Sequence, residues 1–218
     1  MSAANQQLIF WALFVALSLV VFFFDKQSGM LRDTSTAKKK PYSFARVQLA
    51  WWTVIVLSAF IAILITKGAI PTFDSSTLIL LGISAATTGT ARVIDQSDIS
   101  NPAIVRGQNE DGQDLFLDIL SDGTGVNIHR FQTVVFNLVF GIWFICTVLH
   151  NLPACVPSLP NFPNTVMPPI SNNNLILLGL SSGTYAALKT TENKVPAPTM
   201  QDKVTDESGQ AGQGLAQG

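Results

Sequence analysis

Three long stretches without a charged residue constrain the fold of this chain more than any other feature. They cover residues 8–24, 47–66 and 131–149 and are 17, 20 and 19 residues long. A helix needs roughly 17 to 25 apolar residues to cross the ~30 Å hydrocarbon core of a bilayer. Only 12% of the 218 residues are charged, about half the share found in soluble domains. The sequence therefore predicts an all-α membrane protein in which these three stretches cross the bilayer.

Two weaker apolar stretches, at 77–91 and 175–188, are 15 and 14 residues long. Their length alone also fits re-entrant segments or buried core helices. The basic residues favour crossing, because Lys and Arg accumulate on the cytoplasmic side of membrane helices. With five spans and the N-terminus outside, 12 of the 13 Lys and Arg residues are cytoplasmic. If either weak stretch is re-entrant, at best 9 are cytoplasmic and 4 lie outside. We predict a polytopic protein with five transmembrane helices, an outer N-terminus and a cytoplasmic C-terminus.

The predicted organisation follows from these stretches and from the composition between them. It comprises an anchor helix at 1–24, a basic cytoplasmic loop at 25–46, a helical hairpin at 47–94, an acidic cytoplasmic loop at 95–130, a second hairpin at 131–189 and a disordered tail at 190–218. The anchor lacks the basic start and small-residue cleavage site of a signal peptide. A detachable helix that only tethers a core is the alternative.

The two cytoplasmic loops differ in charge. Lys38, Lys39 and Lys40 in the first loop are expected to attract anionic lipid. The acidic loop contains a predicted short amphipathic helix at 113–120. Outside the membrane, the second hairpin has a proline-rich loop that excludes regular helix or sheet and should cap the helix ends. Whether Cys146 and Cys155 pair across this region or remain free thiols is left open.

An internal duplication relates the two hairpins. Leu-Ile-Leu-Leu-Gly-Ile-Ser at 78–84 returns as Leu-Ile-Leu-Leu-Gly-Leu-Ser at 175–181. Upstream, Arg46-Val47-Gln48 corresponds to Arg130-Phe131-Gln132. Both copies begin on the same predicted side of the membrane, so they form a parallel repeat about an axis along the membrane normal.

The short helix of each hairpin carries two kinds of candidate residue. Small residues that let helices approach closely are Gly82, Ala86, Gly179 and Gly183. Hydroxyl residues that would line a pore are Ser84, Thr87, Ser181 and Thr184. Packing hydroxyls that bond back to their own helix are the alternative.

A third candidate group lies at the cytoplasmic rim and comprises Arg46, Gln48, Arg130, Gln132, Asp95 and Asp122. An arginine at a helix N-terminus opposes the helix dipole, so its presence in both copies needs a reason. One reason is topogenic charge with contact to lipid phosphate. The other is bidentate pairing with a rim carboxylate or an anionic ligand.

Several function classes are disfavoured. No ionisable residue lies in the middle of a predicted span, whereas coupled carriers and pumps usually keep one there. His129 and His150 would lie ~30 Å apart at opposite ends of one helix. We therefore expect no enzyme, no metal and no cofactor. The near-zero net charge also gives no sign of nucleic-acid binding.

The chain resembles a group of bacterial inner-membrane proteins built from such a hairpin pair. The resemblance covers 41–192 and is carried by the Leu-Leu-Gly-Ile-Ser-x-x-Thr type of segment at 80–87 and 177–184 and by Leu-Ser-Asp-Gly-x-Gly-x-x-x-His-Arg-Phe-Gln at 120–132. Similar proteins are membrane effectors of anti-phage systems that resemble oligomeric ion channels. The resemblance implies a homo-oligomeric pore in the inner membrane, with a cytoplasmic regulator or ligand still to be identified. The rival is a non-conducting scaffold that recruits partners through its acidic loop and tail.

Overall fold

The computed structural model describes residues 1–33, 38–100, 104–106, 112–122, 125–189 and 194–196. For 95–100, 104–106, 122, 180–182, 184–189 and 194–196 it describes the backbone alone. The helices are α1 (Ala3–Ser28), α2 (Phe44–Lys67), α3 (Ser75–Ser100), α4 (Leu115–Leu120), α5 (Ile128–Ala154) and α6 (Asn172–Lys189). Two short antiparallel pairs join β1 (Ile104–Arg106) to β4 (Lys194–Pro196) and β2 (Ser121–Asp122) to β3 (Gly125–Val126).

The described part of the chain contains four helices long and apolar enough to cross a membrane. They are α1, α2, the Ser75–Ile94 part of α3, and α5. The first of the two weaker stretches, 77–91, lies in this part of α3 and is thus long and apolar enough to cross a bilayer. Helix α6 has 18 residues, or ~27 Å at 1.5 Å per residue, and is not among the four. The structure accordingly describes a mostly helical, membrane-embedded protein with four clear candidate spans.

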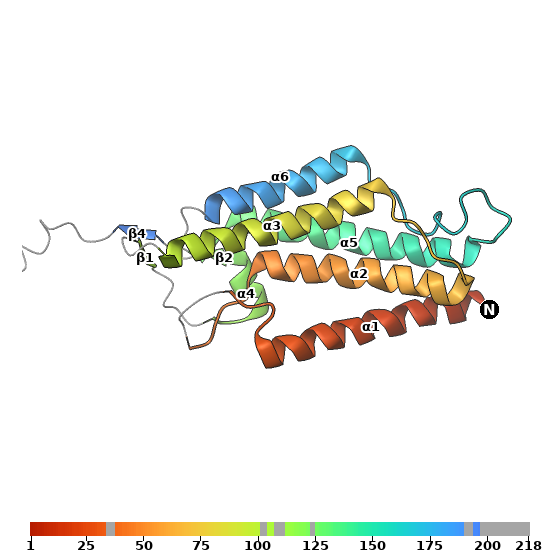
Figure 1. Ribbon diagram of the computed structural model, residues 1–218, viewed down its shortest axis with the longest axis horizontal. Coiled ribbons are helices and arrows are strands. Elements are labelled where there is room, and N and C mark those ends of the chain that lie inside the picture. Colours follow the sequence, from red (N-terminus) through yellow and green to blue (C-terminus); the bar gives the residue numbers. More distant parts are fainter. Residues whose placement is uncertain (34–37, 101–103, 107–111, 123–124, 190–193, 197–218) are drawn as a thin grey trace, which may run out of the picture.

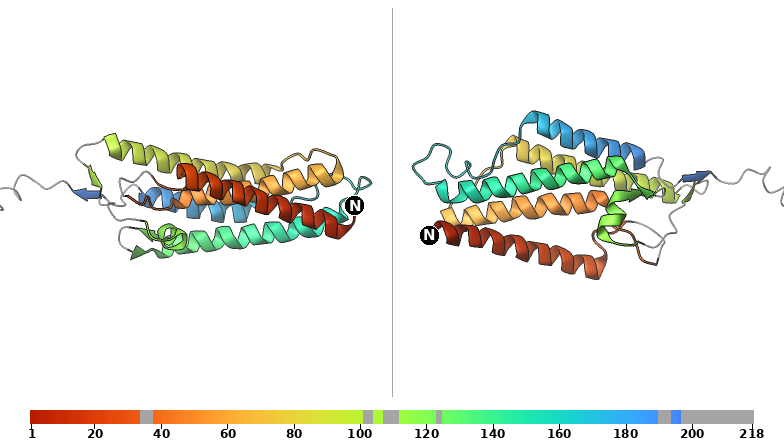
Figure 2. Two further views of the ribbon diagram at one scale, coloured as in Figure 1. Left: turned by 90° about the horizontal axis from the view of Figure 1, so that it is seen from below. Right: turned by 180° about the vertical axis from the view of Figure 1, so that it is seen from behind.

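The long helices run side by side along the length of the molecule (Figure 1). Helices α2 and α3 form one hairpin and α5 and α6 form the other, while α1 lies on the side of the bundle away from α3 and α6. Further views show α1 moving away from α2 towards the end at which α1 finishes (Figure 2). Strands β1 and β4 pair at that same end, so the chain after α6 lies beside the chain after α3.

The helices of the two hairpins begin at equivalent positions of the two sequence copies. Helix α2 starts at Phe44, two residues before Arg46, and α5 starts two residues before Arg130. Helices α3 and α6 each start seven residues before the glycine of their Leu-Leu-Gly segment. The duplicated sequence is therefore matched by the local helix boundaries.

Helix α1 is longer than the predicted anchor because of where its stop signal lies. It ends at Gly29, whose φ of 65° is in the left-handed region and whose N–H donates to the Asp25 carbonyl at 2.8 Å. A residue with a Cβ is strained in that conformation. The helix therefore runs through Ser28, four residues beyond the predicted end at 24, and includes Asp25.

The core lies between the two hairpins and joins them through aromatic and amide groups of α2 and α5. Trp52 and Phe144 are fully buried and meet edge to face, with ring centroids 6.4 Å apart. The Trp52 Nε1–H donates to Asn137 Oδ1 at 2.8 Å, and the Asn137 Nδ2–H donates to the Thr133 carbonyl at 2.8 Å. Trp51 adds a bond from Nε1 to the Asn137 carbonyl at 3.2 Å. These bonds satisfy buried polar groups that would otherwise destabilise the helix pair.

The proline-rich loop covers the helix ends near the N-terminus (Figure 1). Val166, Met167 and Ile170 of this loop are buried in the main core. The Ile170 N–H donates to Ser76 Oγ at 2.9 Å, which connects the loop to the start of α3. Cys155 is buried and Cys146 is exposed on α5, and both are free thiols. The alternative of a disulfide is therefore not realised.

Replacing Gly141 by Ala should destabilise the bundle. A Cβ at Gly141 would lie 2.5 Å from Nε1 of Trp51, so the indole would have to move and its hydrogen bond would weaken. We expect the free energy of unfolding in detergent micelles to fall by about 1–3 kcal/mol. Gly82→Ala is the control, because nothing lies within 4 Å of its added Cβ and Ala favours helix. Equal stability of both variants would contradict the close contact.

Asp74 should make stability pH-dependent at the start of α3. Hydrogen bonds from the Ser76 hydroxyl and then the Ser76 N–H lower the pKa of its carboxyl. Since the pKa is lower in the folded state, the carboxylate stabilises the fold above its ordinary pKa of about 3.9, and this effect is lost as pH falls through the native value. Asp74→Ala should have a lower unfolding temperature than wild type at pH 7. Near pH 3 the two unfolding temperatures should approach each other. Asp114→Ala, which removes a carboxylate without a cap bond, should show no such convergence.

Candidate functional site

The hydroxyl candidates of the first hairpin face the interior of the bundle. Ser84 is 0% exposed and Thr87 is 6% exposed. Thr87 Oγ1 donates to the Ile83 carbonyl at 2.8 Å, which is the back-bonded alternative. Spacings of four and three residues place Ser84 and Thr87 on the same stripe of α3 as Leu80 and Ala91, and both of these are buried. The protomer therefore hides these two hydroxyls rather than presenting them on its outer surface.

The small-residue candidates occupy two environments. Gly82 and Ala86 of α3 are exposed, as is Gly183 of α6. Gly179 is half-buried, and a Cβ there would lie 3.6 Å from Cδ1 of Ile83. Within the protomer, close packing of α6 on α3 thus involves Gly179, while Gly82 and Ala86 face outward.

Four other candidates have side chains outside the described part of the structure. Ser181 and Thr184 lie on α6, Asp95 lies on α3 and Asp122 lies in β2, with only their backbone described. Their proposed roles in pore lining and in pairing with arginine stay predictions.

The two rim arginines bind backbone carbonyls of the segments that precede their own helices. Arg46 Nη1 donates to the Arg32 carbonyl at 2.5 Å and to the Met30 carbonyl at 3.5 Å. Arg130 Nη1 donates to the Ser121 carbonyl at 2.7 Å. A guanidinium has several donors in a fixed fork, so it can hold a loop against a helix start. The paired glutamines differ, because Gln48 is buried and Gln132 is exposed.

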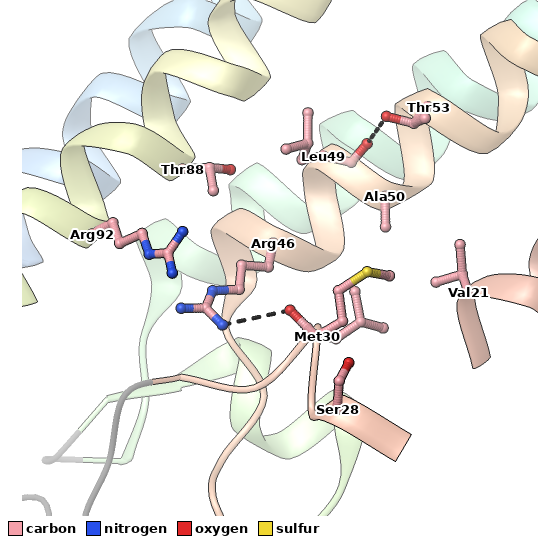
Figure 3. Close-up of a pocket in the computed structure, with 10 residues that line it drawn as sticks. Val21, Ser28, Met30, Arg46, Leu49, Ala50, Thr53, Thr88 and Arg92 are labelled. Atoms are coloured by element: carbon pink, nitrogen blue, oxygen red, sulfur yellow. Dashed lines mark hydrogen bonds between the residues drawn. The ribbon is translucent and has the colours of Figure 1, made fainter. Parts of the chain in front are cut away.

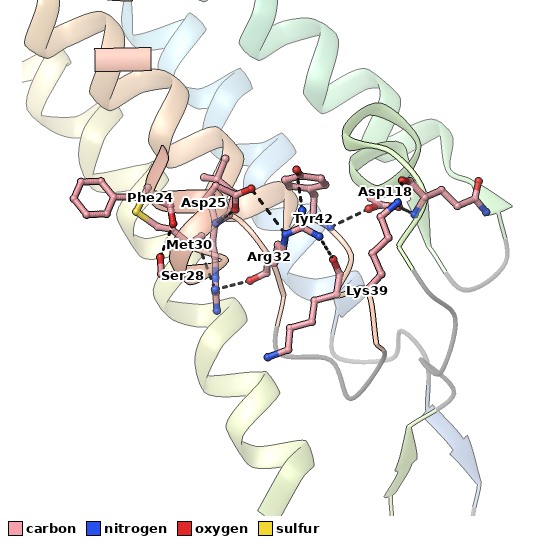
Figure 4. A network of polar contacts seen from close by, with 12 residues as sticks. Phe24, Asp25, Ser28, Met30, Arg32, Lys39, Tyr42 and Asp118 are labelled. Atoms are coloured by element: carbon pink, nitrogen blue, oxygen red, sulfur yellow. Dashed lines mark hydrogen bonds and ion pairs between the residues drawn. The ribbon is translucent and has the colours of Figure 1, made fainter. Parts of the chain in front are cut away.

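A polar network that the sequence interpretation missed ties the basic loop to the end of α1 (Figure 4). Asp25 is buried, accepts from the Leu31 N–H at 2.9 Å and lies 3.9 Å from Arg32 Nε. The Arg32 guanidinium lies over the Tyr42 ring at 4.6 Å and donates to its hydroxyl at 3.2 Å. Burial and then the Asp25 charge raise the pKa of Tyr42. A carboxylate at a helix C-terminus opposes the dipole, and this was the available sequence signal.

The same network connects the two cytoplasmic loops of the prediction. Asp118 of α4 accepts from the Tyr42 N–H at 3.1 Å and from the Gln113 N–H at 2.8 Å. Lys39 Nζ donates to the Gln113 carbonyl at 2.5 Å. A Cβ at Gly112 would lie 2.7 Å from Cα of Pro41, so the two loops are in close contact. Asp118 thus holds the basic loop against α4.

A cavity of about 470 Å³ lies between α1, α2 and α3 at the loop end of the bundle. Two arginines, Arg46 and Arg92, reach into it (Figure 3). The other lining residues are Val21, Ser28, Met30, Leu31, Leu49, Ala50, Thr53 and Thr88. The cavity thus has a cationic end and a mainly aliphatic wall. Elsewhere, the described residues contain no group of three His, Cys, Asp or Glu that could hold a metal ion.

No protein-family model matches the chain, and comparisons with curated proteins and with solved structures also find no match. The resemblance to inner-membrane proteins with duplicated hairpins therefore stays a prediction.

Arg130→Lys should separate the geometric role of this arginine from its charge. The substitution keeps the charge, so topology should be unchanged, but Lys is a single point donor that cannot reproduce the guanidinium fork. We expect about 1 kcal/mol lower unfolding free energy, as for loss of one hydrogen bond. Lys38→Arg, at an exposed position, is the control. Wild-type stability, oligomerisation and conductance in Arg130→Lys would leave the arginine with a topological role only.

Proposed function

We propose that the chain is the subunit of a homo-oligomeric pore in the bacterial inner membrane. In this proposal five helices cross the bilayer, with the N-terminus outside and the C-terminus in the cytoplasm. The apolar helices support the membrane location, and the distribution of basic residues supports the orientation. Passive conduction fits better than coupled transport, because the charge-free stretches contain none of the ionisable groups that carriers use.

The connections at its two ends support α6 as the fifth span. The loop before α6 is bonded to the start of α3 through Ile170 and Ser76. The segment after α6 pairs with the segment after α3, with Val195 opposite Val105. Helix α6 therefore runs from the level of the α3 start towards the α3 end. If α3 crosses the bilayer, α6 crosses beside it.

The observation that carries the pore proposal is the contrast between exposed helix faces. Helix α1 exposes bulky side chains, including Leu8 at 69% and Phe23 at 62%, as expected of a face in contact with lipid. Residues 82–90 of α3 instead expose only small side chains, which are Gly82, Ala85, Ala86, Gly89 and Thr90, although Leu78, Ile79 and Val93 on either side of this stretch are also exposed. Membrane helices associate through such small residues because lipid supplies no hydrophobic drive between them. This face of α3 is suited to contact with another copy of the chain.

Helix α3 itself is separated from α1 by α2 (Figure 1). The interior between the hairpins is filled by Trp52, Phe144 and Leu178, all fully buried. A conducting path would therefore lie between protomers, beside α3, with α1 towards lipid. In this proposal the path borders the α3 contact, and Ser84 and Thr87, which are buried in the protomer, do not line it. A role as a depolarising effector of anti-phage defence extends this proposal and rests on the sequence resemblance alone.

A specific observation also favours the rival scaffold function. Phe116 of α4 is 70% exposed and Leu117 is 42% exposed, although α4 is held at the end of the bundle by Asp118. Exposed apolar residues on an ordered segment are typical of protein interaction sites. Recruitment of a partner there would need no conductance.

Planar-bilayer recording of the purified protein distinguishes the two functions. The pore proposal expects discrete conductance from preparations whose oligomeric state has been established by mass measurement. Absence of conductance from a verified oligomer would favour the scaffold.

Ala86→Leu should weaken assembly without harming the protomer. Ala86 is exposed, so the larger side chain meets solvent or lipid within one protomer but separates two α3 helices in the oligomer. We expect a shift towards monomer and loss of conductance, measured by mass photometry and bilayer recording. Ala16→Leu on the exposed face of α1 makes the same change on the side proposed to face lipid. If both variants assemble like wild type, the α3 face is not the interface.

A further inference from the structure

We propose that the cavity between α1, α2 and α3 binds one anionic phospholipid, with the phosphate at Arg46 and Arg92 and the start of an acyl chain along the aliphatic wall. The proposal depends on the membrane location of the helices and not on whether the protein conducts ions. The volume of the cavity, about 470 Å³, lies within the ~300–1,000 Å³ range of small-molecule sites.

The cationic end of the cavity concentrates positive charge. Arg46 lies in the first turn of α2, where the helix dipole already adds partial positive charge. Its two hydrogen bonds to loop carbonyls both use Nη1, which fixes the guanidinium, and no bond among the described residues uses its other donors. Arg92 has no hydrogen-bond or ion-pair partner among the described residues, and none of the described residues that line the cavity is a carboxylate. An anion would offset the positive charge of these two arginines and could be bound by both guanidinium groups.

The rest of the lining is suited to hydrocarbon. Leu49, Ala50 and Val21 are aliphatic, and the hydroxyls are already used within the protein. Thr53 Oγ1 donates to the Leu49 carbonyl at 2.7 Å, and Thr88 Oγ1 lies 3.0 Å from the Ser84 carbonyl, to which it donates. The Ser28 hydroxyl likewise donates to the Phe24 carbonyl at 2.7 Å. These side chains therefore present mainly carbon to the cavity.

The order of these groups along the helix matches an amphiphile in a bilayer. Arg46 lies at the start of α2, and Thr53 lies seven residues further along, or roughly 10 Å at 1.5 Å per residue. The cationic end is thus at the membrane surface and the aliphatic wall extends into the hydrocarbon region. Helix α1 moves away from α2 at this end (Figures 1 and 2). A soluble phosphate ester would use the arginines but leave the aliphatic wall without a contact.

Arg92→Gln tests the phosphate contact in the complete chain. Arg92 is exposed and its side chain contributes no described bond, so the variant should fold. Native mass spectrometry of the purified protein would measure binding of phosphatidylglycerol and phosphatidylcholine. We expect about tenfold weaker binding of phosphatidylglycerol to Arg92→Gln, equivalent to about 1.4 kcal/mol, and weak binding of phosphatidylcholine to all forms. Lys38→Gln removes one exposed charge from the basic loop, outside the cavity, and should change binding less than twofold.

Two further arms identify the source of the phosphate. Ala50→Leu places a larger side chain in the aliphatic wall and narrows the cavity, so it should weaken phosphatidylglycerol binding. Soluble glycerol 3-phosphate should not displace the lipid. Displacement by glycerol 3-phosphate would overturn the lipid assignment in favour of a soluble phosphate ester. Unchanged phosphatidylglycerol binding by Arg92→Gln would overturn the site. Equal losses of phosphatidylglycerol binding in Arg92→Gln and Lys38→Gln would overturn the site in favour of diffuse attraction to the basic surface.

Discussion

The contact between α2 and α5 is the interaction on which the rest of the bundle depends. In a bilayer, lipid tails are as apolar as the helix surfaces, so helices are held by close packing and buried hydrogen bonds. Here the Trp52 indole reaches the Asn137 amide, and Gly141 lets the Trp51 ring lie against α5. This contact joins the first helices of the two hairpins. Helices α3 and α6 then pack beside them, and α1 rests on the opposite side.

The two ends of the bundle are stabilised in different ways. Near the N-terminus, the proline-rich loop buries Val166 and Ile170 and bonds to the start of α3. At the other end, polar groups dominate: Arg32 and Tyr42 hold the basic loop near the end of α1, and Asp118 connects that loop to α4, 76 positions away. The amphiphilic cavity lies at this second end. A lipid bound there would contact α1, α2 and α3 together, and would therefore couple the peripheral helix to the hairpin proposed to form the oligomer contact.

The sequence predicted what depends on local composition. Charge-free length indicated the membrane helices, the repeat indicated the hairpins, and Arg46 and Arg130 marked equivalent helix starts. It could not decide which face of a small, weakly apolar helix points inward, so Ser84 was expected in a pore and is buried. The contact of Tyr42 with Asp118 joins residues 76 positions apart, and no local pattern specifies such a pair. The cavity likewise depends on the divergence of α1, which periodicity does not record.

The central claim is a five-span bundle of two parallel hairpins with an outer N-terminus, and α6 decides it. Single cysteines at positions 39, 161 and 194, introduced after replacing Cys146 and Cys155, would be labelled by a membrane-impermeant thiol reagent on intact and permeabilised cells. The account predicts labelling of position 161 on intact cells and of positions 39 and 194 only after permeabilisation. Labelling of position 194 on intact cells, or of position 161 only after permeabilisation, would contradict it.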